Sequence, residues 1–359
     1  MFVPRRHAEA TFENNARRVV FDSENFRMKF DVRHHLASTL NSIGRLTIYN
    51  LSQDTENDLM TRNTQVRIRA GYNDDIAYVY VGSVLRVQRG RESGTDRYLQ
   101  VHLRSGLQAE RVITIAREGP LSVQGLIVYI VNKIVDTPPF EKLYVNSASL
   151  NHIPITATRS SFAYTGPAKG ALSAALSGIA GAGSRRATIL ADGRPFGGKR
   201  YRLSWTIRNA EVVIIKTEQI FDPNGDVRDR EGLEAPLNAN LIRVSEKNGM
   251  LDVPEQLEAG IKVKTLLRPH IKTDDLLEVI LPDNIRGDDG YSRNTFYTDK
   301  QWRITSVRHN GDTWRGEYFT EVEGRKIETE TPTEEERDRD RGFVGPGELE
   351  RDERTGRPV

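Results

Sequence analysis

Cysteine is absent from this sequence of 359 residues, and its absence excludes several kinds of chemistry at once. Without thiols the chain cannot form a disulfide, bind zinc in a Cys-rich finger, ligate an iron–sulfur cluster or attack a substrate with a thiolate. Because disulfides persist mainly in oxidising compartments, a chain without cysteine fits assembly in a reducing cytosol.

Long apolar runs are also missing. The longest, residues 126–131, is far shorter than the roughly 20 residues that a helix needs to cross a bilayer. The N-terminus lacks the hydrophobic segment of a signal peptide, so the sequence predicts neither export nor stable membrane association. With 37% hydrophobic and 28% charged residues, the composition is typical of a folded globular protein.

A large excess of one charge is absent as well. The formal net charge is +2, and residues 328–359 hold 11 acidic and 6 basic residues, which leaves 46 basic and 39 acidic residues in the rest of the chain. The basic residues are spread along alternating patterns and do not cluster with aromatic residues. This distribution favours solvated faces over a nucleic-acid groove.

Alternation with a period of two dominates the first hundred residues and predicts half-buried antiparallel strands. Residues 26–32 are one example, with apolar and charged side chains on opposite faces. A longer strand is expected over 77–87, with a bulge or bend at Gly82. A short helix is expected over 53–62. We interpret residues 1–118 as an N-terminal β-barrel domain.

The pattern changes to that of a helix after residue 120. An apolar stripe over 123–134 predicts a helix capped by Ser122, and a second helix is expected from Pro167 to about residue 179. Residues 183–200 are rich in Gly, Arg and Ala without periodicity and are interpreted as a mobile loop before strand alternation resumes. Residues 119–220 are therefore predicted to form a small α+β module.

Strand patterns return in residues 221–327, which we interpret as a C-terminal β-barrel portion that strands from elsewhere can complete. Asn-Gly readily adopts the positive φ angles of a type I′ turn, so residues 309–312 are predicted to form the tip of a hairpin. Residues 328–359 contain few large apolar side chains and cannot offset the entropy of ordering. They are predicted to form a flexible acidic tail.

No catalytic, cofactor-binding or metal-binding residue is predicted. On a strand, His34 and His35 would point to opposite faces, and the other five histidines lack the spacing of a helical metal site. There is no Gly-x-Ser-x-Gly elbow and no phosphate-binding loop. The acidic clusters at 222–229 and 288–289 are typical of turns. Carboxylates that converge from distant positions, as in glycoside hydrolases, stay open as an alternative.

Several segments, taken in order, resemble one family. They are residues 26–30, 46–52, 68–72, 81–84, 162–168, 203–207, 249–254, 263–269, 302–304 and 309–317. Their order is similar to that in the bacteriophage baseplate hub proteins, which connect tail tube to spike in contractile-tailed phages and are related to the hub part of type VI secretion spikes. The motif positions that carry this likeness are Tyr49, Asn50, Leu51, Gly71, Gly82, Trp205, Asn310, Gly311 and Asp312.

The resemblance implies a mainly β fold in which two tail-tube-like β-barrel domains flank the small α+β module. It also implies a structural virion protein of the tail baseplate, assembled in the host cytoplasm, and not an enzyme. As a homotrimer it would form a pseudo-sixfold ring that adapts the hexameric tail tube to the trimeric spike and lines the DNA channel.

The partners implied by the resemblance are sister copies of the chain, the tail tube protein and the spike protein. Baseplate wedge or tape-measure proteins are further candidates, DNA is a partner only in transit, and no cofactor is needed. Two alternatives stay open: a tail-associated peptidoglycan hydrolase and an unrelated carbohydrate-binding β-protein.

Some aromatic residues are expected partly at subunit interfaces, since neighbouring copies can cover exposed strand edges and apolar faces. Packing inside their own domain is the alternative for each of them. The candidates are Tyr78, Tyr80, Trp302, Trp314, Tyr318 and Phe319.

Overall fold

The computed structural model divides the chain into two units, Met1–Ile327 and Glu328–Val359. All residues that the structure describes belong to the first unit. They are residues 5–14, 17–36, 42–59, 64–135, 143–177, 188–189, 195–196, 199–208, 210–221, 227–228, 240–258, 260–280 and 301–326.

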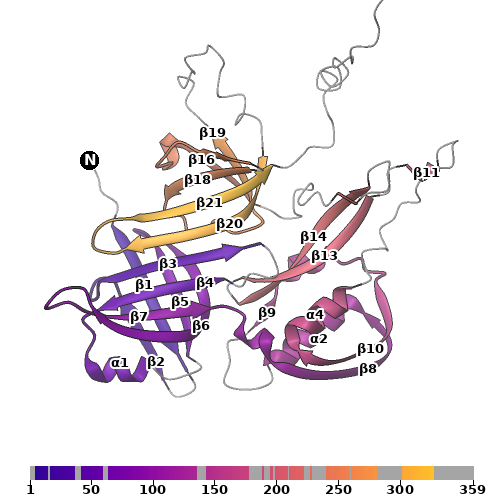
Figure 1. Cartoon of the computed structure of the whole chain (residues 1–359), viewed down its shortest axis with the longest axis horizontal. Coiled ribbons are helices and arrows are strands. Elements are labelled where there is room, and N and C mark those ends of the chain that lie inside the picture. Colours follow the sequence, from indigo (N-terminus) through magenta and orange to yellow (C-terminus); the bar gives the residue numbers. More distant parts are fainter. Residues whose placement is uncertain are drawn as a thin grey trace, which may run out of the picture. The chain divides into compact units, whose positions relative to one another are not determined.

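The N-terminal third of the chain forms antiparallel strands, one α-helix and one 3-10 helix (Figure 1). The strands are β1 (Arg6–Glu13), β2 (Arg18–Asp22), β3 (Met28–His35), β4 (Ile43–Tyr49), β5 (Gln65–Tyr72), β6 (Asp75–Arg91) and β7 (Arg97–Arg104). The helices are α1 (Gln53–Leu59) and η1 (Leu107–Glu110).

The middle of the chain mixes helices and strands, as the change of period predicts. Its helices are α2 (Val123–Val135), α3 (Ser147–Leu150) and α4 (Ala168–Leu176). Its strands are β8 (Val112–Ser122), β9 (Tyr144–Val145), β10 (Thr158–Pro167), β11 (Thr188–Ile189), β12 (Pro195–Phe196), β13 (Lys199–Arg208), β14 (Glu211–Phe221) and β15 (Val227–Arg228).

The C-terminal part of the first unit returns to strands. They are β16 (Leu241–Ser245), β17 (Glu255–Leu257), β18 (Gly260–Leu266), β19 (Leu276–Ile280), β20 (Gln301–Asp312) and β21 (Tyr318–Lys326), with the 3-10 helix η3 (Glu246–Asn248) between β16 and β17. The fold is therefore mainly β with an α+β insert, as the sequence predicts.

One large sheet contains strands from both ends of the first unit. Its order is β17-β18-β21-β20-β3-β4-β7-β6-β5-β1-β2, and β16 pairs with β19, which in turn pairs with β20. The two strand sets meet where β20 pairs antiparallel with β3, from Ser306 opposite His35 to Asp312 opposite Lys29. We call this pairing the β3–β20 seam.

The resemblance implies two separate barrels, whereas the structure has one open sheet that runs through the β3–β20 seam. No closed barrel is present among the strands that the structure describes, and the path of the large sheet is open, from β17 to β2. Because β20 hydrogen-bonds to β3, the C-terminal strands extend the N-terminal sheet. Barrel geometry in the two portions thus stays an implication of the resemblance.

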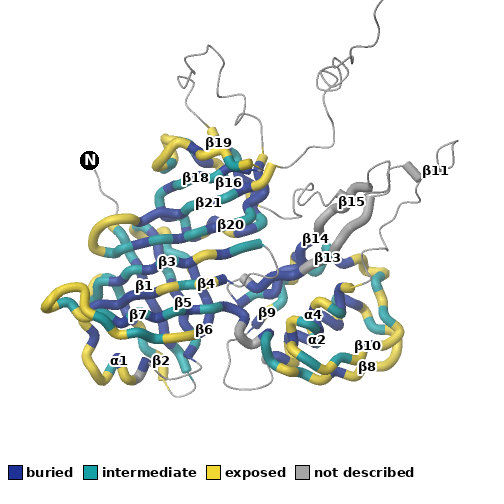
Figure 2. The backbone as a smooth tube through the Cα atoms, viewed as in Figure 1, coloured by how far each residue is buried: buried dark blue, intermediate teal, exposed yellow. Residues whose placement is uncertain are grey.

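Three hydrophobic clusters hold the fold together, one in each portion of the chain. In Figure 2 buried and less buried residues alternate along strands of the large sheet, as expected for strands with one face on a core. The N-terminal cluster also contains Leu267 and Tyr318 from the C-terminal portion. Burial of a large apolar side chain stabilises by roughly 1.5–3 kcal/mol, so these two residues couple the portions.

The helices begin near the predicted positions. Helix α2 starts at Val123, and Ser122 Oγ accepts a hydrogen bond from the Gly125 backbone N–H at 3.4 Å. Helix α4 starts directly after Pro167 and buries Leu172. Helix α1 starts at Gln53 as predicted. The local signals for helix starts are therefore confirmed.

The predicted hairpin tip is wrong in its position. Asn310 and Gly311 lie inside β20, and the turn occupies residues 313–317, where Gly316 has the positive φ of 86°. Gly311 is opposite Tyr318 on one side and Phe30 on the other. A Cβ at Gly311 would lie 2.5 Å from Phe30 Cζ and 2.7 Å from Tyr318 Cδ2. Glycine is needed here for close packing and not for a turn.

The predicted bulge at Gly82 is also displaced. Strand β6 is one long strand, but its register shifts occur opposite Ile68/Arg69 and between Val84 and Arg86. Gly82 itself pairs regularly with Val66. A Cβ at Gly82 would lie 2.6 Å from Tyr80 Oη, so this glycine makes room for the buried tyrosine ring.

Several predictions fall on residues outside those described. The acidic turn clusters contain Asp222, Asp226, Asp229, Asp288 and Asp289, all outside the described residues. The tail over 328–359 is also outside, as is most of the loop over 183–200. Within that loop, residues 188–189 and 195–196 form the short pair of β11 and β12, and residues 199–200 begin β13.

Replacing Gly311 with Ala should destabilise the protein by about 1–3 kcal/mol, because the added methyl group overlaps the Phe30 and Tyr318 rings. Gly94→Ala is the matched control, since a Cβ there meets nothing within 4 Å. Urea unfolding of both variants measures the effect. Equal stability of the two variants would show that the close approach at Gly311 is unimportant.

Candidate functional site

The β3–β20 seam carries charged side chains on its solvent side. Arg308 on β20 forms two hydrogen bonds to Asp31 on β3, with Nε to Oδ1 at 2.8 Å and Nη2 to Oδ2 at 3.0 Å. The hydrogen bond to Asp31 raises the pKa of Arg308. A bidentate pair of this kind fixes geometry as well as adding energy, so it holds the register of the two strands.

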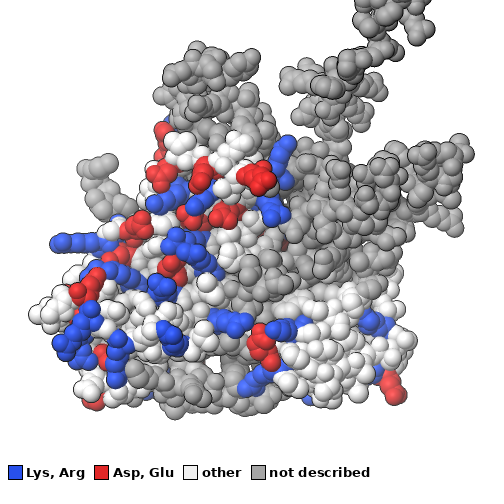
Figure 3. All heavy atoms as spheres, viewed as in Figure 1, with Lys and Arg blue, Asp and Glu red and all other residues white. Residues whose placement is uncertain are grey.

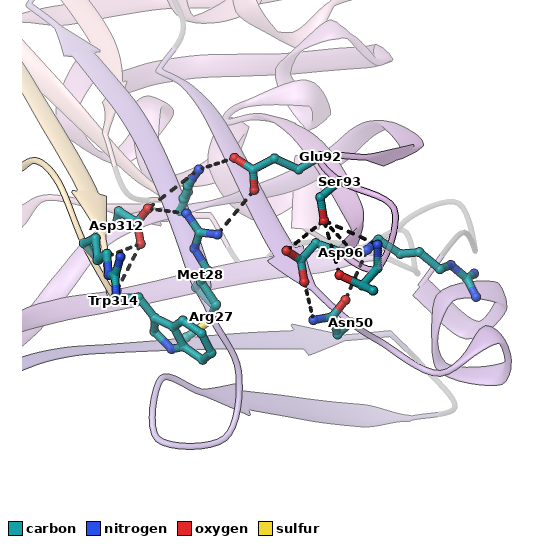
Figure 4. Close-up of polar contacts among 12 residues, drawn as sticks. Arg27, Met28, Asn50, Glu92, Ser93, Asp96, Asp312 and Trp314 are labelled. Atoms are coloured by element: carbon teal, nitrogen blue, oxygen red, sulfur yellow. Dashed lines mark hydrogen bonds and ion pairs between the residues drawn. The ribbon is translucent and has the colours of Figure 1, made fainter.

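Five side chains gather at one end of the seam and form what we call the Tyr49 ion cluster. Its members are Arg27, Lys29, Tyr49, Glu92 and Asp312. Figure 4 shows Arg27 between Glu92 and Asp312. The members come from the start of β3, the end of β4, the β6–β7 turn and the end of β20. The cluster therefore joins four segments that are far apart in the sequence.

The cations of the cluster contact both carboxylates and the aromatic ring. Arg27 lies 3.3 Å from Glu92 and 3.0 Å from Asp312, and Lys29 Nζ lies 3.1 Å from Glu92. The Arg27 guanidinium carbon is 4.4 Å from the centroid of the Tyr49 ring, and Lys29 Nζ is 5.2 Å from it. The aromatic face thus adds cation–π attraction to the ion pairs.

The pKa values in the cluster shift as expected for charges that stabilise one another. The hydrogen bond to Asp312 raises the pKa of Arg27. Hydrogen bonds from Tyr49 and then Lys29 lower the pKa of Glu92. Burial alone would raise the pKa of Asp312, but the hydrogen bonds from Arg27 and from backbone N–H groups of the turn outweigh it and lower that pKa.

Tyr318 lies on β21, which forms a hairpin with β20, and it secures this hairpin from the core side of the sheet. Its hydroxyl donates to the carbonyl of His7 and accepts from the Gly71 N–H at 3.3 Å. Tyr72 donates to the Tyr318 carbonyl at 2.9 Å. Burial raises the pKa of Tyr318. A neutral hydroxyl in a buried site must be hydrogen-bonded, so this position specifies how β21 meets β1 and β5.

Two buried histidines lie at the other end of the seam. The rings of His34 on β3 and His309 on β20 have centroids 6.1 Å apart. His34 Nδ1 is 2.9 Å from Ser42 Oγ and Nε2 is 2.8 Å from the Val79 carbonyl, while His309 Nδ1 is 2.9 Å from Thr320 Oγ1. Burial, and then the neighbouring His34, lowers the pKa of His309 to about 3. Hydrogen bonds thus hold both rings in the buried site.

Four of the predicted motif positions lie in or near the Tyr49 ion cluster. Tyr49 and Asp312 belong to the Tyr49 ion cluster, and Asn50 follows β4 with a positive φ of 57°. Asn50 Oδ1 accepts from the Arg97 backbone N–H at 3.1 Å. Leu51 is buried in the N-terminal core. The cluster and its surroundings thus bring together motif residues from both ends of the unit.

The other motif positions have packing roles. Gly71 contacts the Tyr318 hydroxyl, and Asn310 lines a cleft described below. Trp205 lies away from the seam, in the α+β module, where its Nε1 donates to Ser173 Oγ at 3.0 Å. The motif is therefore not a single site.

The aromatic residues predicted partly at interfaces also divide. Four of them are buried within the chain, as the alternative of packing inside their own domain predicts. They are Tyr80, Trp302, Tyr318 and Phe319. Tyr78 and Trp314 are 48% and 66% exposed. Only these two keep the surface that contact with another chain requires.

A cleft of about 540 Å³ lies next to the Tyr49 ion cluster. It is lined by Lys29, Phe30, Asp31, Arg45, Thr47, Tyr49, Arg91, Glu92, Tyr98, Gln100 and Asn310. The cleft and the cations of the cluster were not predicted from the sequence. Only the pairing register of distant strands brings these residues together, and no local pattern signals it.

Among the described residues, His7, Asp22 and Glu24 could together ligate a metal ion, since their ligand atoms lie within 4.8 Å of one another. However, Arg5 forms an ion pair with Glu24 at 2.7 Å, and His7 lies 3.4 Å from Asp22. The Glu24 carboxylate is therefore already paired with a cation. No helix among the described residues has the length and apolar character needed to cross a membrane.

Solved structures to which the chain is similar include two tail proteins, one of them from a prophage, and a component of a type VI secretion system. No family model and no curated protein sequence matches the chain.

The 43 kDa tail protein of prophage MuSo2 from Shewanella oneidensis has 7% identity and a TM-score of 0.49 over 88% of this chain and 96% of that one. The tail protein from Neisseria meningitidis MC58 has 8% identity and a TM-score of 0.47 over 89% and 96%. The E. coli c3393 protein, a type VI secretion component described as similar to the T4 tail proteins gp27 and gp5, has 11% identity and a TM-score of 0.43 over 88% and 77%.

Acidification should weaken the fold through His309. An unfolded histidine has a pKa near 6.5, and the folded value is about 3, so below about pH 6.5 the unfolded chain binds more protons. Stability should therefore fall as the pH drops from about 6.5 towards 3, by roughly 2 kcal/mol at pH 5 from this group. Urea unfolding at pH 7 and pH 5 measures the loss. In His309→Gln the loss should be smaller, and an equal loss in both proteins would contradict the assignment.

Removal of the Asp312 carboxylate should destabilise the protein more than removal of a carboxylate whose cationic partner is exposed. Asp312→Ala leaves Arg27 without its nearest ion-pair partner in a site where both side chains are at most 22% exposed, so about 1–3 kcal/mol is expected. The control is Glu278→Ala, whose partner Arg243 is 64% exposed, with at most about 1 kcal/mol. Thermal unfolding of the two variants should rank them in this order.

Proposed function

We propose that the chain is a structural, non-catalytic hub of a phage-type tail. In this role it forms a homotrimer, and its ring of six β-units adapts a hexameric tail tube to a trimeric spike and lines the channel for DNA. The proposal extends the family resemblance of the sequence to this chain.

The observation that carries the proposal is the joining of two β-units by the β3–β20 seam. The N-terminal and C-terminal strand sets each have a hydrophobic cluster of their own, yet they share one sheet. Three copies of a subunit with two β-units held side by side supply six such units around an axis. This is the geometric requirement for matching sixfold to threefold symmetry.

The edges of the sheet support assembly with sister copies. Among the described strands, the sheet path ends at β2 and β17, and Val20 on β2 is 46% exposed. Edge strands with unpaired backbone groups are normally protected or covered. Sister copies can cover them, and the exposed Tyr78 and Trp314 are the aromatic residues that we assign to such contacts.

The charge distribution is compatible with DNA in transit. In Figure 3 basic and acidic side chains are intermixed over the described part of the visible face, and neither sign dominates a large area. Such a surface neutralises few phosphates at once, so it does not hold DNA strongly.

The domain boundaries and partners belong to the same proposal. Residues 1–118 and 221–327 act as the two β-units, and residues 119–220 act as the α+β module between them. Its partners are the tail tube and spike proteins, with wedge or tape-measure proteins as additional neighbours. It works without a cofactor, in the virion baseplate, after assembly in the host cytoplasm.

Native mass spectrometry of the purified full chain tests the assembly directly. The expected mass is three times the 40.6 kDa of one chain. A stable monomer at micromolar concentration would contradict the trimer. Clearing of a peptidoglycan suspension by the same preparation would contradict the non-catalytic role and favour the hydrolase.

A further inference from the structure

Two arginines beside the Tyr49 ion cluster have no acidic partner among the described residues. Arg45 on β4 lies opposite Asp31, but both oxygens of that carboxylate are bound by Arg308. Arg91 at the end of β6 lies opposite another cation, Arg97. Both arginines are exposed, and both line the cleft. Each therefore presents guanidinium donors that no acidic side chain among the described residues uses.

The rest of the cleft suits a polar chain more than an apolar one. Thr47, Gln100 and Asn310 offer hydroxyl and amide groups, and the rings of Tyr49 and Tyr98 lie 6.1 Å apart, tilted by 58°. The volume of about 540 Å³ is large enough for several side chains. Arginine with tyrosine is also the composition that recurs at the centres of protein interfaces.

The carboxylates in the cleft favour an acidic protein segment over a nucleic acid as its ligand. Asp31 and Glu92 also line it. A nucleic acid carries a phosphate at every nucleotide and would meet these carboxylates as well as the arginines. A protein segment can place Asp or Glu side chains only at the guanidinium groups and neutral residues elsewhere. A protein partner is thus favoured over a nucleic acid.

We infer that this cleft is the docking site for an acidic segment of a partner protein, whose carboxylates pair with Arg45 and Arg91 while neighbouring residues contact the two tyrosines. Arginine binds carboxylates in a planar, two-bond geometry, which is how Arg308 already binds Asp31 in the adjacent strands. The site goes beyond the hub role and does not depend on the trimer, since every residue in it comes from one chain.

Fluorescence anisotropy with the full chain tests the site. The probe is a short labelled peptide in which Glu alternates with Ala, and the matched probe has Gln in place of Glu. The Glu peptide should bind and the Gln peptide should not, and binding should weaken as salt is raised, because exposed charges are screened. Arg45→Ala/Arg91→Ala should bind the Glu peptide at least about tenfold more weakly.

A second double variant separates this site from general attraction to basic surface. Arg18→Ala/Arg86→Ala removes two exposed cations that do not line the cleft, and it should bind the peptide as the unchanged chain does. Unfolding curves of both variants establish that they are folded. Equal weakening by the two double variants, or no binding of the Glu peptide, overturns the site.

Labelled single-stranded DNA supplies the remaining comparison. Binding of the DNA that is as tight as that of the Glu peptide, and equally sensitive to Arg45→Ala/Arg91→Ala, overturns the choice of a protein partner. Failure of the trimer in native mass spectrometry leaves these outcomes unchanged, so the two proposals are tested separately.

Discussion

The pairing of β3 with β20 is the constraint on which the rest of the described sheet depends. Seven residue pairs, from Ser306 opposite His35 to Asp312 opposite Lys29, join strands that come from the two ends of the first unit. Hydrogen bonds of a β ladder require both strands to be in register over their whole length. The N-terminal and C-terminal strand sets consequently form one continuous sheet, so displacement of one set must move the other.

Different interactions secure the two faces of this pairing. On the core side, the Tyr318 hydroxyl bonds to β1 and β5, and the close approach of Gly311 to Phe30 leaves no space for a side chain unless the ring moves. On the solvent side, Arg308 with Asp31 and the Tyr49 ion cluster fix the register by charge. Apolar packing supplies most of the stability, whereas the directional ion pairs select one register among the alternatives.

Sequence patterns were sufficient where structure depends on near neighbours. The stripe in α2, the proline before α4 and the alternation in β3 predicted elements that the structure contains. They failed where distant contacts decide: the local rule for Asn-Gly placed a turn at residues that close packing keeps inside β20. Arg27 and Glu92, in the same way, meet only because remote strands are paired, so the ion cluster and cleft had no local signal.

The long separation across the seam also affects how the chain is made. Arg308 and Asp31 are 277 positions apart, so the ribosome has to produce most of the protein before β3 can find its neighbour. At roughly 5–20 residues per second, this strand edge waits for about 15–55 s during synthesis. A nascent chain with an open edge for that long is a natural client for a chaperone, and slowing translation between the two strands would lengthen its exposure to aggregation.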